Sequence, residues 1–184
     1  MTIISLGGNC SVAYQLKRYK SSETYPFDWC SITIKELCQV LDNIFEDFHK
    51  IWIKKFSENH IKLSSNEGTF ILKNKYNITF AHEVINKNTI DEFSELLFKR
   101  VQRFKKVKNP TFIRIEINNL SNLKMKLYLH LIDTLEKYFE NFKLIVISKF
   151  PPPFHSKIHH IKLDDFSSNW KYSNVNWEKI FKTI

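Results

Sequence analysis

The order of apolar and polar positions at the start of the chain predicts a strand, a tight turn and a helix. Residues 2–6 form a short apolar run that ends at Gly7, Gly8 and Asn9. From residue 10 to residue 19, apolar side chains recur at every third or fourth position, which is the spacing of one helix face.

Two further helices are predicted from capping-box patterns. Residues 33–36 (TIKE) and 89–92 (TIDE) each place a threonine three positions before a glutamate, so that the two side chains can satisfy each other's backbone amides. The first pattern predicts a helix that reaches Phe48, and the second predicts a helix that ends at Asn109-Pro110. The apolar stripes are Leu37, Val40, Leu41, Ile44, Phe45 and Phe48 for the first helix, and Phe93, Leu96, Leu97, Val101 and Phe104 for the second.

Short runs rich in β-branched and aromatic residues predict the strands. Residues 69–72 and 77–81 read as a hairpin or as two separate short strands, with His82 at the end of the second, and residues 51–66 are ambiguous. The rest of the chain predicts a strand at 111–117, a helix at about 122–139, a strand at 143–148, a short strand at 159–163 and a docking helix within 175–184.

This alternation of strands and helices predicts a single α/β domain that spans residues 1–184. We expect a mostly parallel sheet with helices on both faces, in Rossmann-like layering, and a papain-like fold is the alternative. Residues 151–153, three consecutive prolines, predict a rigid loop rather than a domain boundary, because only about thirty residues follow them. The segment 25–29 (YPFDW) predicts a loop in which the rings of Phe27 and Trp29, on either side of Asp28, are buried.

Charge, hydropathy and cysteine content limit the partners and the cellular location that the sequence allows. The net charge is +9 at pH 7, but only four residues are arginine, so the bidentate groups that read phosphates and bases are scarce and a nucleic-acid partner is unlikely. No apolar run has the roughly 18 residues that a membrane span needs. Three cysteines without a CxxC pair, and no apolar signal at the amino terminus, predict a cytoplasmic protein.

Cys10 is the best candidate for chemistry in the sequence. A cysteine in the first turn of a helix lies near unsatisfied backbone N–H groups, which favour the thiolate and lower the thiol pKa. The flexible Gly7 and Gly8, and the amides from Asn9 to Ser11, could stabilise an oxyanion or hold a phosphate. The alternative is that Cys10 only fills the junction between strand and helix.

The other candidate groups have weaker sequence support. His82 could take the proton of Cys10, whereas Cys30 and Cys38 have no matching context and are predicted to be structural. The glycine pair lacks the spacing of a dinucleotide site and the GK[ST] of a P-loop. The histidines of residues 155–160, beside Asp164 and Asp165, match no zinc motif, so we expect no metal and no cofactor.

Several segments together resemble a family of unknown function that is described as papain-like cysteine peptidases. They are residues 5–16 (SLGGNCSVAYQL), 25–29 (YPFDW), 80–83 (FAHE), 100–104 (RVQRF), 112–114 (FIR) and the tail 165–177. The resemblance implies that Cys10 is the nucleophile and His82 the base. The family usually has Asp after this histidine, whereas this chain has Glu83, so Asp28 or Glu116 are alternatives for the acid that orients the base.

Three functions follow as hypotheses. The first is a thiol-dependent hydrolase or transferase acting on a peptide, acyl or glycan-type substrate, with Cys10 as nucleophile and His82 as base. The second is a glycan-pathway transferase that binds a sugar nucleotide at the first strand-helix turn, with Gly7, Gly8 and Asn9 at the phosphate and positive charge from Arg100, Arg103 and Arg114. The third is a basic binding module without enzymatic activity.

Overall fold

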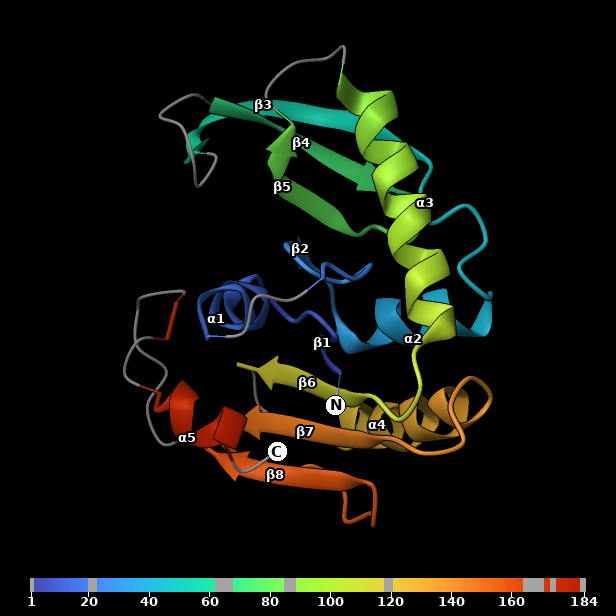
Figure 1. Cartoon of the computed structure of the whole chain (residues 1–184), viewed down its shortest axis with the longest axis vertical. Coiled ribbons are helices and arrows are strands. Elements are labelled where there is room, and N and C mark those ends of the chain that lie inside the picture. The colour runs from blue at the N-terminus through green and yellow to red at the C-terminus, as the bar shows by residue number, and fades with distance from the viewer. Residues whose placement is uncertain are drawn as a thin grey trace.

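The computed structural model describes residues 2–19, 23–61, 68–84, 89–117, 121–163, 171–172 and 175–182. Within these ranges the chain forms an α/β structure with two four-stranded sheets. Figure 1 shows the sheets one above the other. Helices α2 (Ile34–Asp42) and α3 (Ile90–Lys106) lie on one side of the molecule, and α1 (Ser11–Tyr19) lies on the other (Figure 1).

The lower sheet is parallel throughout and has the order β1-β6-β7-β8. Its strands are β1 (Ile3–Ser5), β6 (Thr111–Glu116), β7 (Lys143–Ser148) and β8 (Ile158–Lys162). Both faces of β6 and β7 are buried, which explains why these strands read as continuous apolar runs in the sequence.

Helices cover both faces of this parallel sheet. On one face, the isoleucines at 113, 115, 145 and 147 pack with α1 (Ser11–Tyr19) and α5 (Trp177–Lys182). On the other face, Phe112 and Leu144 pack with α4 (Asn122–Glu136), the helix that connects β6 to β7. The predicted parallel sheet with helices on both faces is therefore present in this part of the fold.

The upper sheet is antiparallel, so the prediction of one mostly parallel sheet misses half of the strands. Its order is β2-β5-β4-β3, formed by β2 (Cys30–Ser31), β3 (Ile51–Ile61), β4 (Gly68–Asn74) and β5 (Thr79–Val84). The turn between β4 and β5 is short, and short turns join only antiparallel neighbours, because parallel strands need a long crossover. The predicted hairpin is confirmed. In the segment 51–66, which was ambiguous in the sequence, the described residues 51–61 form β3, and this strand pairs with β4.

The Asn74 side chain organises this hairpin turn. Its Oδ1 accepts hydrogen bonds from the backbone N–H groups of Tyr76 (3.1 Å) and Ile78 (3.2 Å), and its Nδ2 donates to the carbonyl oxygen of Phe48 (3.0 Å). An asparagine that binds its own turn in this way stabilises a tight reversal of the chain.

One apolar cluster contains residues from both sheets. Phenyl rings form much of the link, because Phe27 contacts Phe104, which contacts Phe112 and Phe139, with ring centroids 5.3–5.8 Å apart. Phe80 of the antiparallel sheet belongs to the same cluster. The high aromatic content of the sequence is thus concentrated where the two sheets meet.

Two helices end earlier than predicted, and a third begins where predicted but without its predicted cap. Helix α2 (Ile34–Asp42) has the predicted capping box at Thr33, but it ends before Phe48, because Ile44, Phe45 and Asp47 adopt positive φ. Helix α3 (Ile90–Lys106) follows Thr89, whose side chain makes no cap hydrogen bond. Helix α4 ends at Glu136, three residues before the predicted end.

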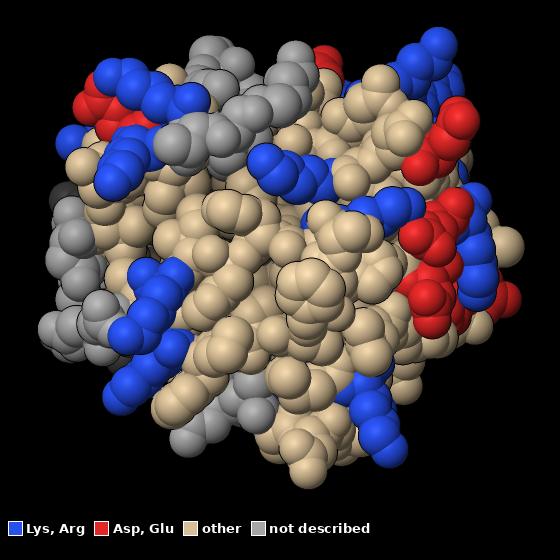
Figure 2. Space-filling view, turned by 90° about the horizontal axis from the view of Figure 1, so that it is seen from below, with Lys and Arg blue, Asp and Glu red and all other residues tan. Residues whose placement is uncertain are grey.

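Among the described helices, none is long and apolar enough to cross a bilayer. On the side of the molecule below β8, lysine and arginine side chains are separated from one another around a broad uncharged area (Figure 2).

Candidate functional site

The turn after β1 requires glycine at two successive positions. Gly7 and Gly8 have φ of +70° and +94°, a region that L side chains rarely adopt. A Cβ atom on Gly7 would lie 2.2 Å from the Cγ2 atom of Ile32, and one on Gly8 would lie 2.3 Å from the carbonyl oxygen of Ile115. Both glycines therefore let the turn pass close to neighbouring chain segments, and this turn carries Cys10.

Cys10 is the cap residue of helix α1. Its carbonyl oxygen accepts the backbone N–H of Tyr14 (3.0 Å), the first hydrogen bond of the helix. Just before it, Asn9 Oδ1 accepts hydrogen bonds from the N–H of Ser11 (3.0 Å) and from the Ser11 hydroxyl. Cys10 is partly exposed and directly precedes Ser11, the first residue of α1, so the predicted position of a thiol at a helix start is confirmed.

The other two cysteines are buried, as expected for structural residues. Burial, together with the smaller effect of the nearby Asp42 carboxylate, raises the pKa of Cys38 to about 12. Burial also raises the pKa of Cys30 well above its usual value, and the nearby Cys10 and Asp28 add to this effect. The Cys30 thiol donates a hydrogen bond to the carbonyl oxygen of Phe27 (3.2 Å). Both thiols are held in their protonated form at neutral pH.

Arg114 joins the turn to its surroundings. Its guanidinium is 2% exposed and donates to the carbonyl oxygens of Leu6 (2.8 Å) and Ile32 (3.2 Å). It lies 3.5 Å from Glu116, which also pairs with Lys124 at 3.1 Å. The sequence predicted Arg114 as a ligand-binding residue, and in the structure this side chain fastens β6 to the end of β1 and to the segment before α2.

Asp28 lies in the aromatic loop next to this site. The carboxylate is buried, and its Oδ2 accepts the backbone N–H of Tyr25 (2.8 Å), which closes the loop on itself. Phe27 and Trp29 are buried on either side of it, as predicted. The Phe27 carbonyl oxygen lies 3.6 Å from the position of a Cβ atom on Gly7, so this loop is in contact with the Cys10 turn.

His82 lies in the antiparallel sheet. The sequence placed it at a strand end, whereas β5 continues to Val84, and β5 pairs with β2 and β4 rather than with β1. The histidine is partly exposed, with its Nδ1 atom buried. It lies two residues after Phe80, and Phe80 is paired with Cys30 of β2. The side chain of Glu83 lies outside the described part of the structure, as do Asp164 and Asp165.

Most of the chain matches a known protein family. A model of the family described as "Putative papain-like cysteine peptidase (DUF1796)" matches residues 1–148. The chain belongs to this family. The match includes the segments that carry Cys10, Asp28 and His82, and it ends at the last residue of β7. The resemblance found in the sequence motifs is therefore confirmed.

A viral protein is similar over nearly the whole chain. It is the uncharacterized protein R408 of Acanthamoeba polyphaga mimivirus, which is 26% identical over an alignment 215 positions long. The alignment covers 96% of this chain and 95% of that protein. No solved structure gives a significant match.

Tyr172 is a residue at the site that sequence reasoning did not single out. It lies beyond the matched part of the family, in the tail segment, and Asn9 Nδ2 donates to its hydroxyl at 3.4 Å. The neighbouring Lys171 carbonyl oxygen accepts a hydrogen bond from Gln15 of α1 (2.6 Å). These residues are more than 150 positions apart in the sequence, so no local pattern could indicate the contact.

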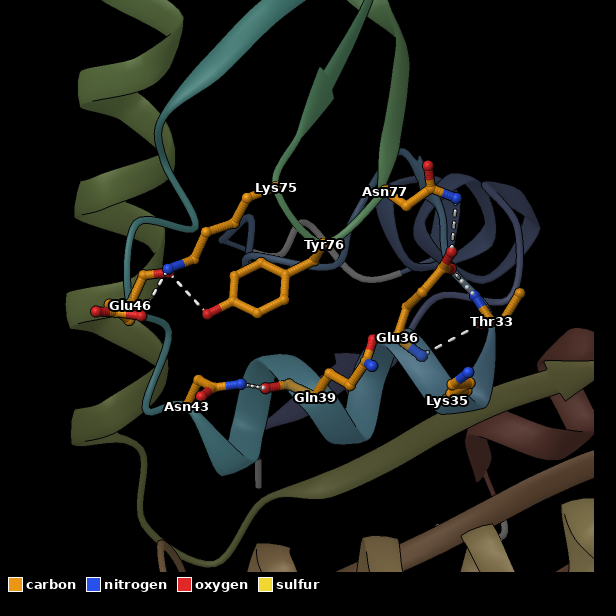
Figure 3. Close-up of a pocket in the computed structure, with 9 residues that line it drawn as sticks. All are labelled: Thr33, Lys35, Glu36, Gln39, Asn43, Glu46, Lys75, Tyr76 and Asn77. Atoms are coloured by element: carbon orange, nitrogen blue, oxygen red, sulfur yellow. Dashed lines mark hydrogen bonds and ion pairs between the residues drawn. The ribbon is translucent and has the colours of Figure 1, made fainter.

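The described cavities lie away from Cys10. One of about 480 Å³ lies between α2 and the β4–β5 turn, and its side chains pair with one another, for example Lys75 with Glu46 (2.6 Å) and Asn77 with Glu36 (3.2 Å) (Figure 3). The cavity is lined by Thr33, Lys35, Glu36, Gln39, Asn43, Glu46, Lys75, Tyr76 and Asn77. Among the described residues, no group of histidine, cysteine and carboxylate side chains could hold a metal ion.

Proposed function

We propose that this protein is a thiol-dependent hydrolase or transferase in which Cys10 is the nucleophile, His82 the base and Asp28 the acid that orients the base. The observation that carries the proposal is the difference between the three thiols. Cys10 is partly exposed at the start of a helix, whereas Cys30 and Cys38 are buried with raised pKa values. A thiolate nucleophile needs access to substrate and nearby positive potential, and only Cys10 has the position for both.

The proposed reaction proceeds by covalent catalysis. The imidazole of His82 takes the proton of the Cys10 thiol, and the sulfur forms a bond to the carbonyl carbon of the substrate. Backbone amides at the start of α1 stabilise the oxyanion. The imidazolium gives its proton to the leaving amine or alcohol, and a thioester remains on Cys10. Water then hydrolyses the thioester, or a second acceptor takes the acyl group.

A chain of contacts between the two sheets supports the choice of His82 and Asp28. The buried Cys30 is close enough to Cys10 and Asp28 for both to raise its pKa. Cys30 pairs with Phe80 in the β2–β5 register, and His82 lies two residues further along β5, where the pairing of β5 with β4 is irregular. The aromatic loop that holds Asp28 directly precedes β2. Strands β1 and β5 belong to different sheets, so the proposed route between Cys10 and His82 runs through the loop and through Cys30.

The glycine turn gives less support to a sugar-nucleotide site. The missing Cβ atoms of Gly7 and Gly8 face Ile32 and Ile115, so the close approach they allow is to the protein's own chain. The buried Arg114 is bound to two backbone carbonyls. For these reasons we favour thiol chemistry. We also propose that the chain is one domain, since one apolar cluster contains residues from both sheets. We propose the cytoplasm as its location, because the three cysteines include no CxxC pair.

The first experiment tests the nucleophile. Wild-type protein and the Cys10→Ala and Cys38→Ala variants are incubated with p-nitrophenyl acetate and with a panel of fluorogenic peptide amides. Intact-mass spectrometry of the ester reaction should show one acyl group on the wild type and on Cys38→Ala, and none on Cys10→Ala. Equal acylation of Cys10→Ala and wild type would rule out Cys10 as the nucleophile.

The second experiment tests the base separately. Carbamidomethylation of Cys10 by iodoacetamide is measured by peptide mass spectrometry between pH 5 and pH 9 in wild type, His82→Asn and His160→Asn. We expect His82→Asn alone to slow labelling near neutral pH, because the thiolate loses the imidazolium that stabilises it. His160 serves as the control, since its ring contacts the Ser148 carbonyl oxygen in the parallel sheet (3.1 Å). An unchanged profile in His82→Asn would assign the base to another group.

A further inference from the structure

The connection between β7 and β8 is unusually short for parallel strands. Strand β7 ends at Ser148 and β8 begins at Ile158, and the residues between them form no helix. A crossover between parallel neighbours normally takes about a dozen residues or more and contains a helix. This connection is possible because an extended chain rises about 3.1 Å per residue, roughly twice the rise of a helix.

Three prolines determine the conformation of this connection. The ring of each proline fixes φ near −65°, and each residue before a proline is driven toward extended ψ. Residues 150–153 are therefore disposed to the polyproline II conformation, which has three residues per turn. The exposure follows this period, because Pro152 is buried while Pro151 and Phe154, three positions apart, are exposed. One edge of the segment thus packs on the protein and another faces solvent.

Hydrogen bonds hold the segment at both ends. The Ser148 hydroxyl donates to the carbonyl oxygen of Phe150 (2.7 Å), and the backbone N–H of Ile158 donates to the carbonyl oxygen of His155 (3.0 Å). The ammonium group of Lys157 pairs with Glu136 of α4 at 2.7 Å. The segment is therefore presented in a fixed conformation, which lowers the entropy lost when a partner binds it.

The exposed edge is markedly apolar. Phe154 is 100% exposed and Phe150 is 43% exposed, although most large apolar side chains of this protein are buried. The side of the molecule on which β8 lies shows a broad area without charged side chains (Figure 2). The Lys149 ammonium group lies 5.8 Å from the centre of the Phe150 ring, so a partner at this edge would meet two apolar rings and one neighbouring positive charge.

We propose that residues 150–154 (FPPPF) are a docking segment for a partner protein that has an aromatic-lined, proline-recognising groove. Such grooves bind preformed polyproline II segments, and they read side chains spaced three residues apart. Pro151 and Phe154 have that spacing on the exposed edge, while Pro152 anchors the segment to its own protein. The proposal is independent of the thiol chemistry at Cys10, since it rests on a different edge of the fold.

The test uses the whole protein and three purified probes, namely an EVH1, an SH3 and a WW domain. Isothermal titration calorimetry should give a dissociation constant below about 1 mM for at least one of them. Phe154→Ala should weaken that binding at least about tenfold, as expected for an aromatic anchor. Phe98→Ala is the matched control, because Phe98 is 46% exposed on α3, and it should leave the binding unchanged.

Three results would overturn the proposal. They are the failure of all three domains to bind, an equal effect of Phe154→Ala and Phe98→Ala, and binding to phosphatidylserine vesicles that depends on Phe154. The last result would assign the exposed ring to a lipid surface. Far-ultraviolet circular dichroism of each variant, compared with wild type, separates lost binding from lost folding.

Discussion

The Arg114 guanidinium donates a hydrogen bond to the carbonyl oxygen of Leu6 over 2.8 Å, across 108 positions of the sequence. Arg114 is also the buried partner of Glu116. Glu116 keeps Lys124 as a partner at 3.1 Å, so the main loss on removal of Arg114 is the donor to the buried carbonyl oxygens of Leu6 and Ile32, an effect of about 1–3 kcal/mol. We therefore expect Arg114→Met to lower the free energy of unfolding by about that amount, as measured by urea denaturation.

The double variant Arg114→Met/Glu116→Gln gives the control for this effect. It should recover little of the loss, because Lys124 already compensates Glu116 in the single variant and the two carbonyl oxygens lack their donor in both variants. Arg18→Met, at an exposed position of α1, should change stability by less than about 0.5 kcal/mol. A small effect of Arg114→Met alone would mean that the guanidinium does not fasten the turn.

Phe27 is fully buried and contacts the rings of Phe45, Phe48 and Phe104, with centroids 5.6–5.8 Å away. Phe27→Ala removes these contacts and leaves a cavity, so we expect a loss of about 3–5 kcal/mol in the free energy of unfolding. Chemical denaturation with tryptophan fluorescence as the signal measures the change. If the loss were below about 1 kcal/mol, the aromatic loop would have to be a movable lid instead of part of the core.

Gly8→Ala tests the strain in the nucleophile turn. The new Cβ atom would meet the backbone oxygen of Ile115 and would force alanine into positive φ, which costs about 1–3 kcal/mol for the backbone alone. Gly7→Ala should be less harmful, because the obstructing atom is a methyl group of the Ile32 side chain, which moves more easily than backbone. Thermal unfolding of the two variants gives the comparison, and the reverse order of stability would contradict the described turn.

Alkaline pH should destabilise the protein through Cys38. Burial raises the pKa of its thiol to about 12 in the folded chain, from an ordinary value of 9.0. The stabilising effect of the neutral thiol is complete below pH 9 and is lost as the pH rises toward 12. Cys38→Ala should show a smaller fall in the free energy of unfolding across this interval than wild type. Parallel curves for the two proteins would show that the thiol is not held neutral by burial.

The sequence predicted those elements whose signals are local. The capping box at Thr33, the glycine turn before α1 and the buried strands around Arg114 all depend on neighbouring residues. The early end of α2 was not predictable, because Phe45 and Phe48 keep the apolar spacing of a helix while they are buried from a non-helical segment.

The layout of the candidate site was less accessible to sequence reasoning. Two features of it depend on contacts between distant segments, namely the separation of β5 from β1 and the contact between Asn9 and Tyr172. The Arg114 side chain shows a third limit, since a basic residue within a strand can bind a ligand or the chain itself. The sequence does not reveal that the carbonyl oxygens of Leu6 and Ile32 lie within hydrogen-bonding distance of the Arg114 guanidinium.

The pairing of β1 with β6 has a consequence for how the protein is made. Ile3 is matched with Thr111 and Ser5 with Ile113, so the strand that precedes the nucleophile turn has no sheet partner until more than half of the chain has been synthesised. Closing so large a loop is entropically costly and slow compared with the formation of the β4–β5 hairpin. On a ribosome, the amino-terminal segment with Cys10 would therefore leave the exit tunnel early, and its thiol would stay accessible to oxidants and chaperones until β6 emerges.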